Sequence, residues 1–299
     1  MKRILFLWMI LLCLPVRAEE TVLVRYKDRL TVPADTVYLD MDTVKVSDWP
    51  AFSDFLSALP RLEKVDMFAT RVGQKHISEL TKQFPQITFG WTIVIGDGHT
   101  VRTDQTAFST LHSSRDDPHT SRDLSLLRFC RELRALDIGH NEVDDLTFLS
   151  GLTELRVLIL GRNRISDLSP LANLTQLEYL ELFSNDVRDL SALKNMPRLT
   201  DLNLCFNRIG DLSPLCSLGA LQRVWIYNCN NYSDASPVPR EQVEMLRSAL
   251  PGAVIDDVSY VTEGGWREGS HWETVHSIFR TGVYLPFPDS NNTASEETK

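Results

Sequence analysis

The feature that most constrains the fold is a sequence period of 22 residues in the middle of the chain. Leucine recurs with this spacing at five positions, which are Leu133, Leu155, Leu177, Leu199 and Leu221. In the first four periods the same pattern follows, L-x-x-L-x-L/I-x-x-N-x-V/I. Because one period cannot bury its own apolar face, successive periods must stack into one array with a continuous core.

This pattern is the signature of leucine-rich repeats, in which each period forms one coil. The alternating apolar residues predict a short strand in every coil, and stacked strands predict a parallel sheet. Ser169-Pro170 and Ser213-Pro214 predict a helical start after the strand, with serine as N-cap and proline at the first helical position. The predicted fold class is therefore α/β, a solenoid with a parallel sheet on its concave side and short helices and turns on its convex side.

One asparagine follows the strand in each of the four regular coils. These residues are Asn141, Asn163, Asn185 and Asn207. A buried amide can satisfy loop backbone groups of neighbouring coils that would otherwise lack hydrogen bonds. We therefore expect a structural asparagine ladder, in which Cys229 replaces asparagine in a fifth, degraded coil.

The first 18 residues are typical of a secretory signal peptide. Lys2 and Arg3 precede an apolar run from Ile4 to Leu14, and residues 16–18 form a small-x-Ala cleavage site. This run has eleven residues, whereas a membrane span needs about 20. We expect cleavage after Ala18, a secreted or cell-surface protein, and no membrane insertion after cleavage.

The remaining chain divides into four parts. Residues 19–129 read as irregular coils of the same solenoid, with a hairpin near 91–102, and residues 130–232 hold the regular repeats. Residues 233–286 predict a helix, a strand and an aromatic tail that cap the open end, as terminal coils require. Residues 287–299 are polar and predicted to be disordered.

Composition and motifs argue against several function classes. Without the signal peptide the net charge is 28 − 40 = −12, which disfavours nucleic acid as a partner. His271 and His276 flank Glu273 without the spacing of a zinc protease, and phosphate-loop and serine-hydrolase motifs are absent. We therefore predict no catalytic residue, no metal and no cofactor. The repeat positions of Cys130, Cys205, Cys216 and Cys229 do not suggest a disulfide framework.

The strand residues beside the buried pair should face outward on the concave sheet. Nothing in the fold requires aromatic residues there, and aromatic side chains are typical of protein interfaces. The predicted partner-binding residues are Ile159, Tyr179, Glu181, Phe183, Asp201, Asn203, Arg223, Trp225 and Tyr227. An alternative stays open, in which the N-terminal hairpin, the 109–121 loop or the aromatic tail covers this face.

The segment Leu133 to Leu218 resembles the internalin-like repeats of exported bacterial proteins. Asn163 to Leu171 and Leu171 to Thr175 carry the resemblance most closely. The flanks, Ala34 to Arg102 and residues 264–267, resemble leucine-rich-repeat proteins of gut-type Firmicutes. The resemblance implies a surface or secreted protein that binds other proteins without catalysis. The chain lacks the internalin cap sequence and wall anchor.

These observations favour a secreted, non-catalytic binding module that grips a protein or peptide with its concave face, and we expect a monomer. The alternative is an accessory subunit that docks another exported bacterial protein. A glycan-binding protein and a hydrolase are less favoured interpretations of the sequence. A fixed partner would be recovered in stoichiometric amounts from the producing cell's secretions.

Overall fold

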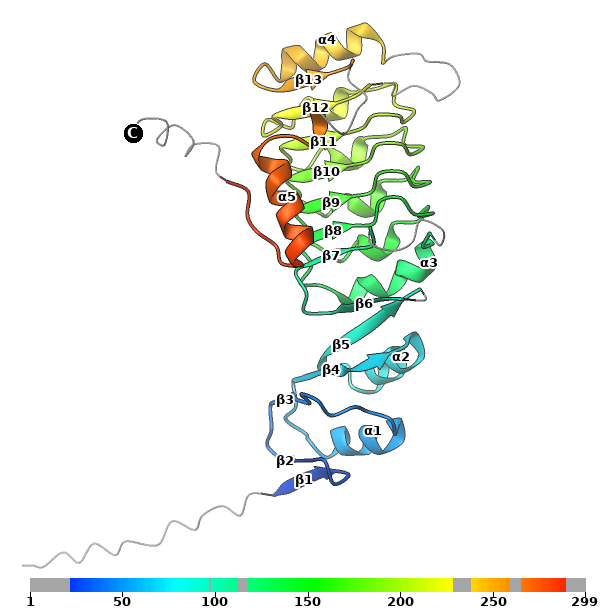
Figure 1. Cartoon of the computed structure of the whole chain (residues 1–299), viewed down its shortest axis with the longest axis vertical. Coiled ribbons are helices and arrows are strands. Elements are labelled where there is room, and N and C mark those ends of the chain that lie inside the picture. Colours follow the sequence, from blue (N-terminus) through cyan, green and yellow to red (C-terminus); the bar gives the residue numbers. More distant parts are fainter. Residues whose placement is uncertain (1–21, 97, 112–117, 228–237, 259–264, 289–299) are drawn as a thin grey trace, which may run out of the picture.

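The computed structural model describes residues 22–96, 98–111, 118–227, 238–258 and 265–288. The expected signal peptide, nearly all of the expected disordered tail, and Cys229 lie outside these residues. The described chain forms a solenoid in which strands stack on one side and helices or helical turns on the other (Figure 1). The predicted leucine-rich-repeat solenoid is thus confirmed.

The regular coils contribute to a seven-stranded parallel sheet. Its central residues pair in register from coil to coil, as Leu136 does with Leu158 and Leu158 with Leu180. This register follows from the repeat, since equivalent residues must face the same core. The strands, in spatial order, are β7 (Ala107–Ser109), β8 (Ala135–Asp137), β9 (Val157–Ile159), β10 (Tyr179–Glu181), β11 (Asp201–Asn203), β12 (Arg223–Trp225) and β13 (Val254–Asp256).

The convex side of the regular coils consists of single 3-10 turns. They are η2 (Thr147–Leu149), η3 (Ser169–Leu171), η4 (Ser191–Leu193) and η5 (Ser213–Leu215). The predicted serine N-cap is wrong, because Asp167 accepts the hydrogen bond of the Ser169 amide at 2.8 Å. Asp145, Asp189 and Asp211 do the same in their coils, so this column of carboxylates is structural.

The asparagine side chains join neighbouring coils. In Asn185, Oδ1 accepts from the Ile165 amide at 3.0 Å, and Nδ2 donates to the carbonyls of Leu160 and Leu182 at 3.0 and 2.9 Å. Asn163 and Asn207 make the equivalent bonds, and Asn141 bonds to the His119 amide and to Thr110. The residue before each asparagine is left-handed, with φ between 56° and 59°; these are His140, Arg162, Ser184 and Phe206.

The N-terminal coils are longer and carry α-helices. A four-stranded sheet has the order β3 (Tyr38–Asp40), β4 (Lys64–Val72), β5 (Thr88–Ile95) and β6 (His99–Arg102). Strands β5 and β6 pair antiparallel, at the position of the expected hairpin. Helices α1 (Trp49–Ser57) and α2 (Gln74–Gln83) lie on the helical side, and β1 (Leu23–Tyr26) and β2 (Leu30–Pro33) form a hairpin at the N-terminal end. Before the regular coils come α3 (Ser121–Leu124) and the 3-10 turn η1 (Ser125–Phe129).

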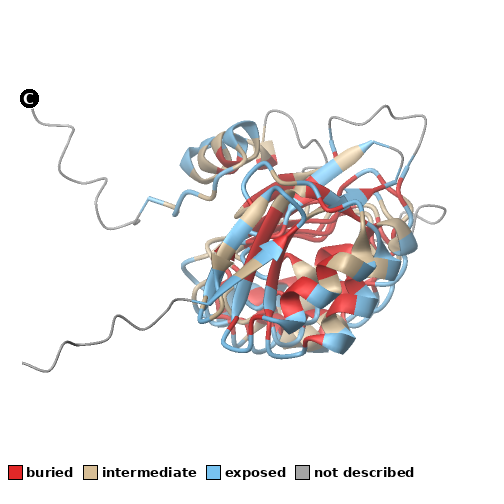
Figure 2. Ribbon diagram, turned by 90° about the horizontal axis from the view of Figure 1, so that it is seen from below, coloured by how far each residue is buried: buried red, intermediate tan, exposed pale blue. Residues whose placement is uncertain are grey.

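One apolar core runs through the whole solenoid, from Tyr26 to Ile255. Viewed along the coils, buried residues line the interior between strands and helical turns (Figure 2). Cys130 lies in this core, and Cys130, Cys205 and Cys216 are free thiols. The part of the chain that the structure describes contains no helix long and apolar enough to cross a membrane.

The aromatic tail lies in a different place from the one expected. Helix α4 (Arg240–Ala249) packs on η5 beside the last strands, but α5 (Ser270–Thr281) contacts β7 and β8, at the other end of the sheet. Residues 265–288, here called the C-terminal segment, therefore run back along the strands instead of capping the open end (Figure 1). The physical reason is the concave face itself, where Tyr179 and Trp225 pack against Trp266 and the acid Glu181 pairs with Arg267.

Candidate interaction surface

The concave face is formed by the outward residues of β8 to β12. The middle residue of each strand points into the core, so the two residues beside it point to the concave side. On β10 these are Tyr179 and Glu181, and on β12 they are Arg223 and Trp225. Every strand contributes in the same way, and the face therefore combines aliphatic residues on β9 with aromatic and acidic residues on β10 to β12.

The expectation of an open concave face is wrong. Of the nine predicted partner-binding residues, two are half-buried, Arg223 and Tyr227. The other seven are buried, and Glu181 has 0% and Trp225 7% of its surface exposed; the seven are Ile159, Tyr179, Glu181, Phe183, Asp201, Asn203 and Trp225. The structure instead has the alternative arrangement, in which the aromatic tail covers this face.

Aromatic contacts hold the N-terminal end of the C-terminal segment. Trp266 is fully buried, with its ring centroid 5.4 Å from that of Tyr179 and 5.8 Å from that of Trp225. Gly265 approaches the Trp225 ring so closely that a Cβ there would lie 2.5 Å from it. Phe287 returns to the same region, 6.4 Å from the Tyr179 ring. The segment therefore lies on the sheet at both of its ends.

One ion pair and one hydrogen bond join the segment to the buried acids of the face. Arg267 Nη2 lies 3.0 Å from Glu181 Oε1, and His271 Nδ1 lies 2.6 Å from Asp201 Oδ2. Arg223 also binds Asp201, at 2.5 Å, and donates to the Trp266 carbonyl at 3.2 Å. Burial alone would raise the pKa of Asp201, but the hydrogen bond of His271 and the charge of Arg223 lower it below its ordinary value.

A third carboxylate of the face, Asp137, forms no ion pair with any of the residues that the structure describes. It is buried, and burial raises its pKa to about 7. The hydrogen bond from the Gly139 amide, 3.0 Å long, opposes this shift, and the negative charge of Glu181 adds to it. Together with Glu181 and Asp201, Asp137 makes the covered face strongly acidic.

The fit between segment and face leaves polar atoms unmatched. Trp266 Nε1, Arg267 Nε, Arg223 Nη2 and Asn203 Nδ2 are buried without a hydrogen-bond partner among the described residues. Native cores rarely leave buried donors unpaired, because each one costs about 1–3 kcal/mol. The contact therefore has the chemistry of an interface and is less well satisfied than the solenoid core.

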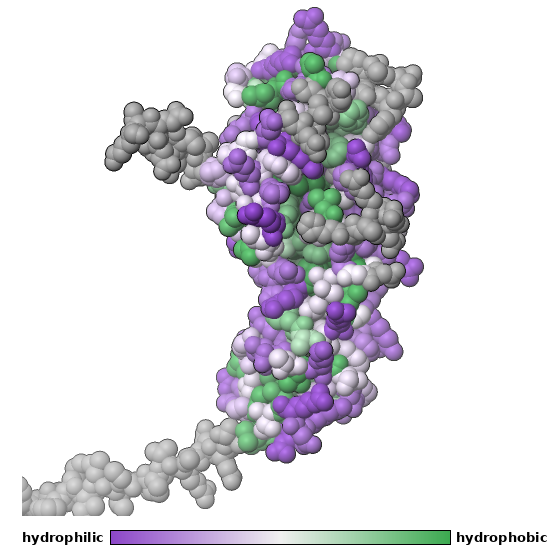
Figure 3. Space-filling view, viewed as in Figure 1, coloured by the Kyte–Doolittle hydropathy of each residue, from purple (hydrophilic) through white to green (hydrophobic). Residues whose placement is uncertain are grey.

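Beyond the segment, the N-terminal sheet presents a face that the described residues leave partly exposed. Tyr38, at 51% exposure, donates to Asp66 at 2.9 Å, and Lys64 pairs with Asp66 at 3.0 Å. On the next strands, the Arg102 guanidinium lies 3.9 Å from the centre of the Phe68 ring. Figure 3 shows apolar and neutral residues exposed among hydrophilic ones over these coils. We call the outward residues Tyr38, Asp40, Lys64, Phe68, Val94 and Arg102 the open face.

No sequence motif pointed to the open face, because the N-terminal coils lack a fixed period. The signal that could have revealed it is the alternation along each strand, where Val65 and Met67 point inward and Lys64 and Phe68 outward. A strand that alternates in this way buries one side only, so its second side needs either solvent or a partner.

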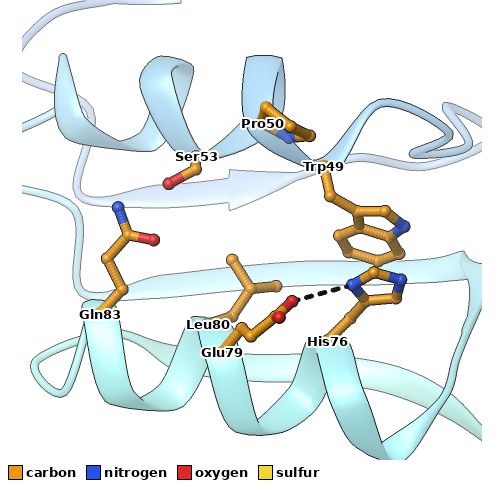
Figure 4. A pocket seen from close by; sticks show the side chains of 7 residues that line it. All are labelled: Trp49, Pro50, Ser53, His76, Glu79, Leu80 and Gln83. Carbon is orange, nitrogen blue, oxygen red and sulfur yellow. Dashed lines mark hydrogen bonds and ion pairs between the residues drawn. The ribbon is translucent and has the colours of Figure 1, made fainter.

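A separate pocket of about 280 Å³ lies between α1 and α2 (Figure 4). The Trp49 and His76 rings stack at 4.2 Å, and His76 Nδ1 lies 3.2 Å from Glu79. The pocket lining holds neither a hydroxyl within reach of a base nor a third metal ligand. Across the described ranges, no group of three or more histidine, cysteine or carboxylate residues gathers in a way that could hold a metal.

The comparisons with known proteins agree with the repeat architecture. A family model described as leucine-rich repeats (2 copies) matches residues 153–195. A search of curated proteins found none that matches this chain. Among solved structures, internalin C2 of Listeria monocytogenes has 25% sequence identity and a TM-score of 0.37, over 68% of this chain and 74% of that one.

Two further structures are similar to the chain at lower identity. Another internalin of Listeria monocytogenes has 22% identity and a TM-score of 0.45, over 76% of this chain and 75% of that one. A leucine-rich-repeat protein of Leptospira interrogans has 18% identity and a TM-score of 0.42, over 68% of this chain and 56% of that one. The match to the family model and the stacked coils together show a leucine-rich-repeat fold, which is typical of protein–protein binding.

Proposed function

We propose that the protein is an exported, non-catalytic binding module that recognises a protein or peptide with the concave side of its solenoid. The observation that carries this proposal is the open face, where aromatic and basic side chains stand on a rigid sheet without cover from the rest of the described chain. Tyrosine, phenylalanine and arginine are the anchors that protein interfaces use most, and a curved array offers them over a long surface.

The geometry of the open face favours a protein over a small molecule. Its residues spread over β3, β4, β5 and β6, and they make a surface rather than a cavity. Lys64 and Arg102 are held in place by Asp66 and Asp104, so little side-chain freedom is lost when a partner binds. The buried residues of the concave face, Ile159 to Tyr227, remain a proposed second part of the surface.

Recovery of a partner tests the function. The purified chain is incubated with native secretions and cross-linked, in parallel with a double variant, Tyr38→Ala with Phe68→Ala, and with a control on the helical side, Lys82→Ala. We expect the parent chain and the control to recover a protein that the double variant loses. Equal recovery by all three contradicts the open face as the binding surface. Stoichiometric recovery from the producing cell would instead identify an accessory subunit.

The export proposal rests on the N-terminal sequence and has its own test. Mature protein should start at Glu19, be found outside the cytoplasm, and run as a monomer in light scattering. The internalin-like motif from Asn163 to Leu171 supports such an exported bacterial origin. Intact-mass measurement of secreted material decides the point, since a species that retains Met1 would contradict export through a cleaved signal peptide.

A further inference from the structure

The C-terminal segment is not part of the solenoid core. The core cluster that runs from Tyr26 to Ile255 contains none of its residues. Trp266, Val275 and Ile278 instead belong to a second cluster, together with the outward residues of the sheet. The repeats thus bury their own leucines without the segment, and the segment lies on a sheet that is already complete. This is the geometry of a ligand on its receptor.

The chemistry of this contact is complementary on both sides. The sheet supplies the acids Glu181 and Asp201 between the rings of Tyr179 and Trp225. The segment supplies an aromatic residue followed by arginine, Trp266-Arg267, and then His271 as a second possible cation four residues later. Opposite charges and stacked rings meet in one desolvated patch, which is how specific peptide sites are built.

The contact is also imperfect. Trp266 Nε1 and Arg267 Nε are buried and find no acceptor among the described residues. A buried donor without an acceptor weakens the association of the segment with the face. A partner with the same aromatic and basic groups, placed to satisfy the donors, would bind more tightly than the segment does.

We propose that the C-terminal segment is an internal ligand of the concave face, and that the face binds a basic-aromatic protein segment that displaces it. The partner chemistry is that of the segment itself, an aromatic residue followed by arginine. This inference deepens the proposed function in one respect, since it too takes the partner to be a protein. In the intact chain no described segment lies over the open face, whereas the face from Ile159 to Trp225 becomes available only when the segment leaves.

Proteolytic cleavage of the folded, full-length chain at one site tests whether the C-terminal segment is an internal ligand. Residues 259–264 are replaced by a site-specific protease sequence, and the folded chain is cleaved there. We expect the released piece to separate on dilution while the body keeps its circular dichroism spectrum and cooperative melting. A labelled peptide of residues 265–288 should then bind the emptied body saturably. A piece that separates only when the body unfolds, or an emptied body that does not bind the peptide, would overturn the proposal.

Variants of the peptide test the chemistry of the site. Trp266→Ala and Arg267→Ala should each weaken binding to the emptied body about thirtyfold or more, as anchor residues do. The matched control is Glu273→Ala, at an exposed position of α5, which should bind like the parent peptide. Exchange of charge, with Glu181→Arg in the body and Arg267→Glu in the peptide, should restore part of the lost affinity. Equal binding by all these peptides would overturn the assigned chemistry.

A second peptide separates a partner class from a purely internal contact. It keeps the tryptophan, arginine and histidine at their spacing and replaces the other positions by alanine and serine. Binding of this peptide supports a basic-aromatic partner, whereas binding of the native sequence alone refutes it. These experiments probe only the face beneath the C-terminal segment. Their failure would therefore not contradict the proposal that a partner binds the open face. Loss of the partner at Tyr38 and Phe68 would likewise say nothing about the segment.

If the cleaved body proves unstable, the intact chain still answers the question. Arg267→Glu should speed hydrogen exchange within α5 and leave exchange in β8 to β12 unchanged. Faster exchange throughout the repeats would show that the segment is part of the core, and the proposal would fail.

Discussion

Arg267 and Glu181 form a buried ion pair, with 3.0 Å between Nη2 and Oε1, although 86 residues separate them in the sequence. Glu181 has no exposed surface, and its carboxylate accepts from this guanidinium and from the Tyr179 hydroxyl, which donates at 3.2 Å. Together with the aromatic contacts of Trp266, the pair attaches the C-terminal segment to the sheet. Removal of the pair should therefore weaken the attachment of the segment to the sheet more than it weakens the folding of the repeats.

Arg267→Ala should lower the free energy of unfolding by about 1–3 kcal/mol, the cost of an unsatisfied buried group. A carboxylate left buried and unpaired in a rigid core would cost more, about 3–5 kcal/mol. The smaller value is expected here because the segment can detach from the sheet, which allows water to solvate the Glu181 carboxylate. Urea denaturation measures the difference, with the exposed Arg280→Ala as control. A loss of the larger size would mean that the segment cannot detach.

Trp225→Ala should destabilise the chain even though its side chain points away from the solenoid core. The ring packs on Trp266 and Gly265, so its removal exposes apolar surface and leaves a cavity beneath the segment. Truncation of a buried tryptophan costs about 3–5 kcal/mol. The cost should be smaller here, because the segment can detach and no cavity then remains. Thermal melting compares the variant with Lys194→Ala on the convex side. An unchanged melting temperature for Trp225→Ala would contradict the cover over this face.

The repeat made the strand register predictable because it acts locally and recurs. Once Leu136, Leu158 and Leu180 occupy equivalent positions, the stacking of their strands follows without knowledge of any distant contact. The left-handed residues, such as Arg162, carried no such signal, since they are not glycines. The loop geometry before the asparagine imposes that conformation on whatever residue stands there.

The position of the C-terminal segment could not be predicted in the same way. Its contacts have no period, and its aromatic residues suited a cap over the open end as well as a cover over the face. The remaining signal was charge complementarity, with Glu181 and Asp201 on the sheet and Arg267 and His271 in the tail. Such a match between two groups, far apart in the sequence, becomes visible only when the fold brings them together.

The core of the coils gives the most direct test of the register. Leu158→Ala and Leu180→Ala each remove a fully buried side chain and should cost about 2–5 kcal/mol. Calorimetry or urea unfolding measures both, and Lys194→Ala serves again as the surface control. Unfolding curves that match the parent protein would show that these leucines do not point into the core.

The asparagine ladder should contribute through hydrogen bonds and not through packing. Asn163 accepts from the Val143 amide at 2.9 Å and donates to the Ile138 and Leu160 carbonyls at 3.0 Å. Asn163→Ala leaves these groups without partners and should cost about 1–3 kcal/mol. Asn163→Asp keeps the acceptor for the Val143 amide but turns an oxygen toward the Ile138 and Leu160 carbonyls, so it should destabilise the chain at least as much as alanine. An Asn163→Asp variant more stable than Asn163→Ala would contradict this role of the donated bonds.

The buried Asp137 should make stability depend on pH in an unusual direction. Burial raises its pKa from 3.8 to about 7, so between these values the folded state binds more protons than the unfolded state. The contribution of Asp137 to the free energy of unfolding is then highest below about pH 4, falls as the pH rises to about 7, and levels off above it. A shift of this size corresponds to about 4 kcal/mol.

Asp137→Asn keeps an acceptor for the Gly139 amide and removes the ionisation. The variant should therefore be more stable than the parent protein at about pH 8, and its advantage should shrink as the pH falls toward about 4. Urea denaturation at a series of pH values measures this difference directly. The exposed Asp54→Asn corrects for the loss of one negative charge from an acidic protein. A difference between variant and parent that stays constant across this pH range would show that Asp137 is ionised in the folded chain, and that Arg267 or solvent reaches it.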